Sequence, residues 1–305
     1  MENLYNLKKT IAFIINPISG GIRKDNFPAL IGKIIDRNRF DVEINFTRSA
    51  SHNLELAQQA VEQKKDIVVA VGGDGTINNV AKYLVKTPVI FGIIPQGSGN
   101  GLARHLHIPI DNIKALSLIN QLNYRTIDTG MANDYFFINV AGAGFDAHVS
   151  HMFAKAPKRG FWSYTKISLN EFARYKPRLY KINIDGQNLV LPAFIVCVAN
   201  GSQYGNNAFI APDAKLSDGL FDVSIMKPFK VYKMPFIGAA LFLKKFSQSP
   251  YVHYFRGRNV TIIRPEAEVF NIDGEPVEME KDVNIRILPS SLHLIVPTKD
   301  QESIY

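Results

Sequence analysis

The chain has 305 residues, of which 46% are hydrophobic and 20% charged, with a net charge of +8. This length accommodates one large domain or two ordinary ones, and the composition is typical of a folded globular protein, which excludes a disordered chain. The positive charge indicates an anionic partner, such as nucleic acid, a membrane surface or a phosphorylated substrate. The single cysteine, Cys197, lies in the apolar run 193–199, so an internal disulfide is excluded and a buried thiol is expected. The apolar run 235–243 is too short to cross a bilayer.

The first 120 residues alternate short β-branched runs with helical patterns. Strands are predicted at 10–16, 41–47, 66–71 and 89–94, and helices at 25–37, 52–64, 76–85 and 100–106. This alternation predicts a parallel α/β sheet with helices on both faces, in which ligands bind at the carboxyl ends of the strands.

Glycine-rich loops follow three of these strands, at 15–21 (INPISGG), 72–80 (GGDGTINNV) and 95–106 (PQGSGNGLARHL). Gly72 and Gly73 allow a sharp turn, and the helix that follows directs its first N–H groups toward the same place, as phosphate sites do. Asp74 would repel a bare phosphate, so it is expected to orient a hydroxyl, a metal or water. The alternative is a turn that uses glycine for its geometry alone. None of the loops matches a Walker A or a G-x-G-x-x-G pattern, which argues against a P-loop or dinucleotide fold.

The sequence pattern changes after a predicted linking helix at 111–122. Strand-like runs at 124–132, 135–143, 180–199, 219–227, 258–264 and 283–288, punctuated by Asp-Gly turns, predict a mostly antiparallel β domain. The predicted domains are therefore 1–123 and 124–295. Helical insertions at 160–175 and 230–246 mix aromatic residues with Lys and Arg; they are either ordinary amphipathic helices or surfaces for peripheral membrane contact.

The ordered set of motifs resembles the diacylglycerol kinase catalytic-domain family, which also contains sphingosine and ceramide kinases. The resemblance continues through 135–149, 211–223 and 271–276, and so covers nearly the whole chain. It implies a Rossmann-like N-terminal sheet of the type found in NAD kinase and phosphofructokinase, followed by a β-sandwich. Residues 296–305 are expected to pack back on the first domain.

The resemblance also implies an ATP and Mg²⁺ site. Its nucleotide-binding positions are Asn16, Pro17, Ser19, Gly20, Thr47, Gly72, Gly73, Asp74, Gly75, Thr76, Asn78, Asn79, Gly97, Ser98 and Asn100. A structural magnesium would use the carboxylate of Asp218 and carbonyls near Lys215 and Leu220; on sequence alone, 217–222 is equally well explained as a turn.

The general base implied by the resemblance is Glu275, with Asp273 beside it; in sphingosine kinases the acid equivalent to Asp74 takes this role. We interpret Glu275 as the base and Asp74 as the organiser of nucleotide and magnesium, although 273–274 also fits a simple hairpin turn. Two positions depart from the family pattern. Asn79 stands where members often have glutamate, and Gly101 where bacterial members often have aspartate.

The function predicted from these residues is an ATP-dependent lipid kinase acting on diacylglycerol or a sphingosine-like lipid. The alternatives are a soluble NAD kinase, which shares the GGDGT motif, and a catalytically silent homologue that binds nucleotide or membrane. A cytoplasmic protein that visits the inner membrane face is expected, and bacterial relatives suggest a homodimer. No nucleic-acid reading module accompanies the positive charge.

Overall fold

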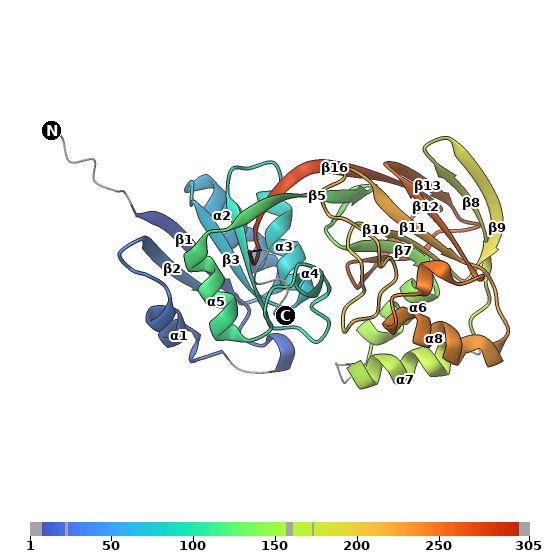
Figure 1. Ribbon diagram of the computed structural model, residues 1–305, viewed down its shortest axis with the longest axis horizontal. Helices are drawn as coiled ribbons and strands as arrows, with labels where there is room; N and C mark the ends of the chain where they lie inside the picture. The colour runs from blue at the N-terminus through green and yellow to red at the C-terminus, as the bar shows by residue number, and fades with distance from the viewer. Residues whose placement is uncertain (1–7, 22–23, 157–160, 173, 299–305) are drawn as a thin grey trace. The chain divides into compact units, whose positions relative to one another are not determined.

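The computed structural model describes residues 8–21, 24–156, 161–172 and 174–298 (Figure 1). Its contacts divide the chain into two compact units. The first contains the residues up to Gly97, Leu106–Thr126 and the residues from Ser291 onward, and the second contains Ser98–His105 and Ile127–Ser290.

The first unit is built on a parallel sheet with the strand order β2-β1-β3-β4. The last residues of the long strand β16 (Asp282–Ile295) extend it, because His293 and Leu294 pair in parallel with β4. Helix α1 packs against α5, and α2 against α3, so two helix pairs flank the strands (Figure 1). The bounds are β1 Lys9–Ile15, η1 Ser19–Gly21, α1 Phe27–Ile34, β2 Phe40–Phe46, α2 Ala50–Glu62, β3 Ile67–Gly72, α3 Asp74–Leu84, β4 Ile90–Pro95 and α5 Asn112–Gln121.

The central strands of this sheet are buried along their length. Every residue of β3 and β4 is buried, as expected for parallel strands covered on both faces. The prediction of a parallel α/β sheet from strand and helix alternation is confirmed.

The second unit is an antiparallel β-sandwich. One sheet has the order β12-β11-β10-β7-β14-β15, and the other contains β16-β13-β8-β9, with β5 joined to β16 and β6. The strand bounds are β5 Tyr124–Ala132, β6 Tyr135–Phe137, β7 Val140–Gly144, β8 Arg178–Ile184, β9 Gln187–Ala193, β10 Ile195–Ala199, β11 Phe221–Met226, β12 Val252–Gly257, β13 Asn259–Ile263, β14 Glu268–Ile272 and β15 Glu275–Met279. The helices are α4 Gly101–His105, α6 Phe145–Ala154, α7 Phe161–Phe172, η2 Val231–Lys233, α8 Met234–Phe242 and η3 Phe246–Gln248.

Strand β10 lies in a sheet that is covered on one face by the other sheet and on the other face by helices. Val196 and Val198 point into the core between the two sheets, whereas Ile195, Cys197 and Ala199 point to the other face, where residues of α6 and α8 join the cluster. Successive side chains of a strand alternate between faces, and here both faces are apolar because both are covered. Cys197 is a buried free thiol, as predicted.

The unit boundaries differ from the predicted division at 123/124. Residues Ser98–His105 pack with the second unit, and the end of β16 returns to the first. Near the carboxyl end, Asn123 Nδ2 donates to the carbonyl of Val296 at 3.0 Å. The packing of 296–305 stays a prediction, because residues 299–305 lie outside the described residues.

Two helical features differ from the prediction. Helix α6 was not expected; it begins where Gly144, at a φ of 105°, turns the chain out of β7. The predicted helix 230–246 is divided into η2, α8 and η3. The break between α8 and η3 occurs where Lys244 adopts a left-handed conformation with a φ of 57°. Among the described helices, none is both long and apolar enough to cross a membrane.

Candidate active site

The three glycine-rich loops follow β1, β3 and β4, and the parallel pairing places all three at the carboxyl edge of the first unit's sheet. Asn16, directly after β1, connects the first loop to the second. Its N–H donates to the carbonyl of Val71 at 3.0 Å, and its Nδ2 donates to Thr76 Oγ1 at 3.1 Å. The first loop is therefore held against the start of α3.

Gly20 brings the first loop into contact with the third. Its φ is 66°, and a Cβ at this position would lie 2.3 Å from the carbonyl oxygen of Gln96. Gln96 in turn donates its N–H to the carbonyl of Gly72 at 2.7 Å. Only glycine allows this approach, because any side chain would meet the backbone of the neighbouring loop.

Gly73 is the N-cap of α3, and a Cβ on it would lie 3.2 Å from the Cα of Gly97. The cap has no side-chain hydrogen bond, and Asp74 lies in the first turn of the helix. The first turn of a helix leaves N–H groups without intrahelical partners and carries the positive end of the helix dipole. This edge therefore has the properties of an anion-binding site.

The other predicted nucleotide-binding residues fall into two groups. Thr47 is buried and donates its N–H to the carbonyl of Ile15 at 2.9 Å, and Ser19 Oγ donates to the carbonyl of Asn16 at 3.3 Å; both belong to the first unit. Pro17 lies in the first loop, and Gly75, Asn78 and half-buried Asn79 lie in α3. Ser98 and Asn100 are part of the second unit. Nothing in the structure explains Asn79.

The structure explains the other departure from the family pattern. A Cβ on Gly101 would lie 2.7 Å from Asn139 Nδ2 and 3.1 Å from the carbonyl oxygen of Gln203. Asn139 Nδ2 already donates to that carbonyl at 2.8 Å. An aspartate at position 101 would therefore displace this buried hydrogen bond.

Lys24 was missed by the sequence analysis. Its side chain is buried, and its Nζ donates to the carbonyl of Ser19 at 2.5 Å, so the ammonium holds the first glycine-rich loop. Burial lowers the pKa of Lys24. The only signal in the sequence was a lysine soon after the two glycines, which does not distinguish it from a surface lysine.

In the second unit, Asp273 and Gly274 form the two-residue turn of the β14–β15 hairpin, with φ values of 49° and 91°. The carboxylate of Asp273 accepts the N–H groups of Ile138, Asn139 and Val140 at 2.8–2.9 Å. Asp273 therefore holds the hairpin against the chain before β7.

Glu275 is the first residue of β15 and is exposed. Of the two predicted acids, it is Glu275 whose carboxylate faces solvent. Residues 273–274 can therefore be a hairpin turn and still serve the predicted catalytic site, because Asp273 fixes the turn that precedes Glu275.

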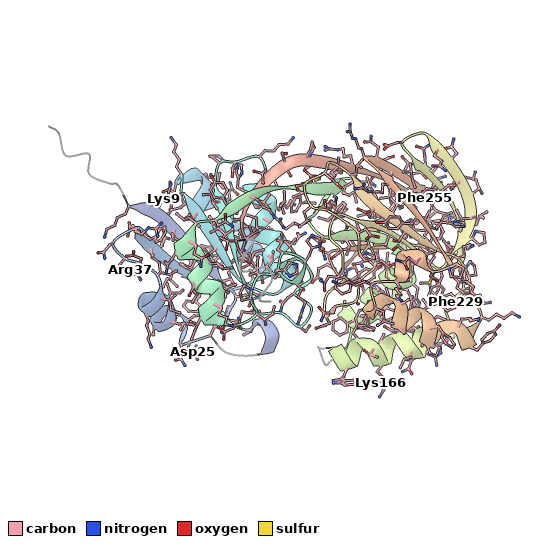
Figure 2. All side chains as sticks on the ribbon, in the orientation of Figure 1. Lys9, Asp25, Arg37, Lys166, Phe229 and Phe255 are labelled. Carbon is pink, nitrogen blue, oxygen red and sulfur yellow. The ribbon has the colours of Figure 1, made fainter. Side chains whose placement is uncertain are left out.

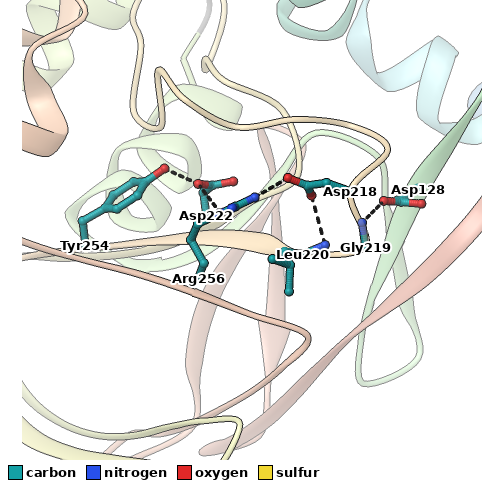
Figure 3. A network of polar contacts seen from close by, with 7 residues as sticks. All are labelled: Asp128, Asp218, Gly219, Leu220, Asp222, Tyr254 and Arg256. Carbon is teal, nitrogen blue, oxygen red and sulfur yellow. Dashed lines mark hydrogen bonds and ion pairs between the residues drawn. The ribbon is translucent and has the colours of Figure 1, made fainter.

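In the predicted magnesium loop, Asp218 pairs with a cation of the chain itself (Figure 3). Asp218 Oδ1 accepts the N–H of Leu220 at 3.2 Å, and Asp218 Oδ2 pairs with the guanidinium of Arg256. Arg256 Nε also lies 3.4 Å from Asp222 Oδ1, to which Tyr254 donates its hydroxyl.

Both oxygens of Asp218 are thus engaged, and a guanidinium supplies the positive charge that a metal would bring. Magnesium held by Asp218 and the carbonyls near Lys215 and Leu220 stays a prediction, and a metal there would compete with Arg256 for the carboxylate of Asp218. Within the described residues, no group of three His, Cys, Asp or Glu side chains is arranged to hold a metal.

Asp146, which the sequence analysis quoted only as part of a motif, is a buried carboxyl group. It lies in the first turn of α6 and accepts hydrogen bonds from Tyr204 Oη at 3.1 Å and Asn271 Nδ2 at 3.3 Å. Burial raises the pKa of Asp146 to about 6, against the opposing effect of these hydrogen bonds. Its helical position could not be predicted because α6 itself was not.

Comparison with known proteins identifies the family of the chain. The family model "Diacylglycerol kinase catalytic domain" matches residues 10–132, and "YegS C-terminal NAD kinase beta sandwich-like domain" matches residues 139–296. The chain belongs to the diacylglycerol kinase catalytic-domain family. The resemblance to this family is therefore confirmed, and the roles assigned to individual motif residues stay predictions.

The chain is similar to curated bacterial members along almost all of its length. It is 26% identical over 303 residues to a diacylglycerol kinase from Bacillus subtilis, covering 97% of this chain and 99% of that protein. It is also 26% identical over 274 residues to one from Staphylococcus saprophyticus, covering 88% and 90%.

A crystal structure of a diacylglycerol kinase from Bacillus anthracis superposes with a TM-score of 0.74 at 21% identity, covering 95% of this chain and 97% of that one. The α/β domain followed by a β-sandwich is therefore the fold of this family, as predicted. The relatives do not favour the NAD kinase alternative.

Proposed function

We propose that this protein is an ATP-dependent lipid kinase, which transfers the γ-phosphoryl group of ATP to a lipid hydroxyl. The observation that carries the proposal is the convergence of three glycine-rich loops at one sheet edge, with Gly20 against Gln96 and Gly73 against Gly97 beside the start of α3. Such an edge suits a phosphate chain. Membership of the family supports a lipid hydroxyl as the acceptor, and the names of the relatives favour diacylglycerol over a sphingosine-like lipid.

In this proposal the lipid oxygen forms a bond to the γ-phosphorus while the bond from that phosphorus to the β,γ-bridging oxygen breaks, and ADP leaves. Glu275 accepts the hydroxyl proton, because it is an exposed carboxylate at the end of a turn fixed by Asp273. Asp273 is a positioning residue, since its own oxygens accept main-chain N–H groups.

Asp74 organises the nucleotide and its magnesium ion. It stands in the first turn of α3, next to the glycines that approach the other loops. Magnesium bound with ATP would neutralise the charge that develops on the phosphoryl oxygens.

The test incubates the purified full chain with labelled ATP and magnesium, adding either a total lipid extract or NAD. Label in a chloroform-extractable product is expected. Label in NADP alone would overturn the proposal, and ATP binding without any labelled product would indicate a catalytically silent homologue. Separate vesicles containing diacylglycerol or sphingosine then identify the acceptor.

A further inference from the structure

Helix α8 and the preceding turn η2 expose an unusual amount of apolar surface. The nine residues of α8 read MPFIGAALF, and of these only Ile237 is buried. Phe236 is 72% exposed, Tyr232 64% and Leu243 65%. A helix that is apolar on all sides is normally buried in a protein core or in lipid, so this one lacks the environment that its sequence requires.

Helix α7 repeats the pattern on the same face of the sandwich. Tyr164, Ile167 and Phe172 pack on the apolar cluster that Ile237 of α8 also joins. On its other side, Trp162 is 81% exposed and Leu169 52%. Figure 2 shows Lys166 extending from α7 away from the sheet.

We define the docking face as the exposed apolar residues that α7, η2, α8 and the residue after α8 present to solvent. They are Trp162, Leu169, Val231, Tyr232, Phe236, Phe242 and Leu243.

The charges that flank η2 and α8 are all positive. Residues 227–245 contain five lysines, at positions 227, 230, 233, 244 and 245, and no acidic residue. Lys233 Nζ lies 5.4 Å from the ring of Tyr232 and 5.9 Å from that of Phe236, so cations and aromatic rings are interleaved. The partner of this face must therefore be both apolar and anionic.

We propose that the docking face inserts into the headgroup region of a bilayer that contains anionic lipids, with Lys233 of η2 and the lysines that flank η2 and α8 above it. A bilayer offers apolar depth beneath a negative surface. A second copy of this chain fits less well, because a two-fold interface would bring the same lysines together. The inference is independent of the proposed reaction, because binding to vesicles requires neither ATP nor turnover.

Within the predicted insertion at 160–175, residues 160 and 173 lie outside the described residues. Exposed apolar residues of the β8–β9 hairpin, such as Leu179 and Val190, are 52% and 64% exposed; they provide a control of matched exposure.

The test measures sedimentation of the full chain with vesicles of phosphatidylcholine, alone or with about one third phosphatidylglycerol. The triple variant V231S/Y232S/F236S is compared with the control variant L179S/V190S, and both are checked by circular dichroism and thermal unfolding. We expect strong binding to anionic vesicles only, at least tenfold weaker binding for the triple variant, and a change of less than twofold for the control.

A second variant, K230Q/K233Q, separates charge from apolar contact. It keeps every apolar residue of the docking face, and we expect its binding to anionic vesicles to fall severalfold and to lose part of its dependence on salt. Equal binding of wild type and triple variant to anionic vesicles would overturn the proposal. So would a dimer, seen by sedimentation velocity, that the triple variant abolishes in a protein that binds no vesicles. Vesicle binding by a protein that phosphorylates no lipid would leave this inference standing and refute the proposed function.

Discussion

The glycine-rich edge of the first unit and the Asp-Gly turns of the second differ in the atoms that make contact. In the first unit, main-chain atoms of Gly20, Gln96, Gly73 and Gly97 approach one another because side chains are absent. In the second unit the contacts are made by carboxylates. Asp273 accepts hydrogen bonds from three main-chain N–H groups, and Asp218 and Asp222 both pair with Arg256. An edge made of backbone suits an anionic ligand, whereas a region of carboxylates suits protons and cations.

Gly20→Ala tests the backbone contacts of the first unit, and we expect it to have the largest effect on stability and ATP binding. A Cβ would meet the carbonyl oxygen of Gln96, and the φ of 66° is strained for any L side chain. We expect a loss of about 3 kcal/mol of stability and at least tenfold weaker ATP binding. Thermal unfolding and calorimetric titration with ATP measure the two effects.

Gly21→Ala is the matched control. Its φ is 72°, but a Cβ there would have no atom within 4 Å, so only the backbone strain of about 1 kcal/mol remains. If both variants bind ATP equally well, the contact between the loops is not what shapes the site.

A second effect concerns the buried carboxyl of Asp146. Because its pKa is raised to about 6 in the folded protein, the folded state holds a proton that the unfolded state has lost between about pH 6 and pH 4. The contribution of this group to stability therefore rises as pH falls through 6. Relative to Asp146→Asn, which cannot titrate, wild type should gain about 2 kcal/mol between pH 7 and pH 4.5.

Urea unfolding of both proteins at each pH measures this difference. Curves of stability against pH that run parallel for wild type and variant would show that Asp146 stays ionised in the folded protein.

A smaller effect is expected from Arg256→Gln. The side chain of Arg256 is 42% exposed, whereas that of Asp222 is 1% exposed and would lose a compensating cation. We expect a loss of about 1.5 kcal/mol, with less than 0.5 kcal/mol for the nearby Arg258→Gln. Chemical unfolding of the two variants measures both values.

Chelation tests whether the loop that contains Asp218 binds a structural metal. If Arg256 supplies the positive charge, EDTA should leave the melting temperature of the wild-type protein unchanged. A clear drop in melting temperature on chelation, restored by magnesium, would instead place a structural metal at Asp218.

The two units also differ in how much of them could be predicted. The four parallel strands and the three loops were found because buried β-branched runs and glycine spacing are local signals, readable at Ile67–Gly72 and in the residues that follow. The close approach of Gly20 to the carbonyl of Gln96 could not be predicted, because the two residues are far apart in the sequence and meet only in the folded structure.

In the second unit the strands were predictable but the polar contacts were not. Arg256 lies 38 residues from Asp218 and reaches it through the pairing of β11 with β12. Asp146 is buried in helix α6, which begins directly after Gly144. The positive φ of Gly144 cannot be recognised in the sequence, where this residue does not differ from any other glycine. The Asp273–Gly274 turn was predictable, but the three amides that fix it come from residues more than 130 positions earlier.

The central claim is that the first unit holds the nucleotide while Glu275 of the second accepts the proton of the lipid. The most direct measurement compares lipid phosphorylation and ATP binding in Glu275→Gln and in Glu278→Gln, a second exposed glutamate of β15. We predict a loss of turnover of at least 10²-fold for Glu275→Gln, with ATP binding retained, and near-normal turnover for Glu278→Gln. Near-normal turnover in Glu275→Gln would contradict the account and move the base to Asp74.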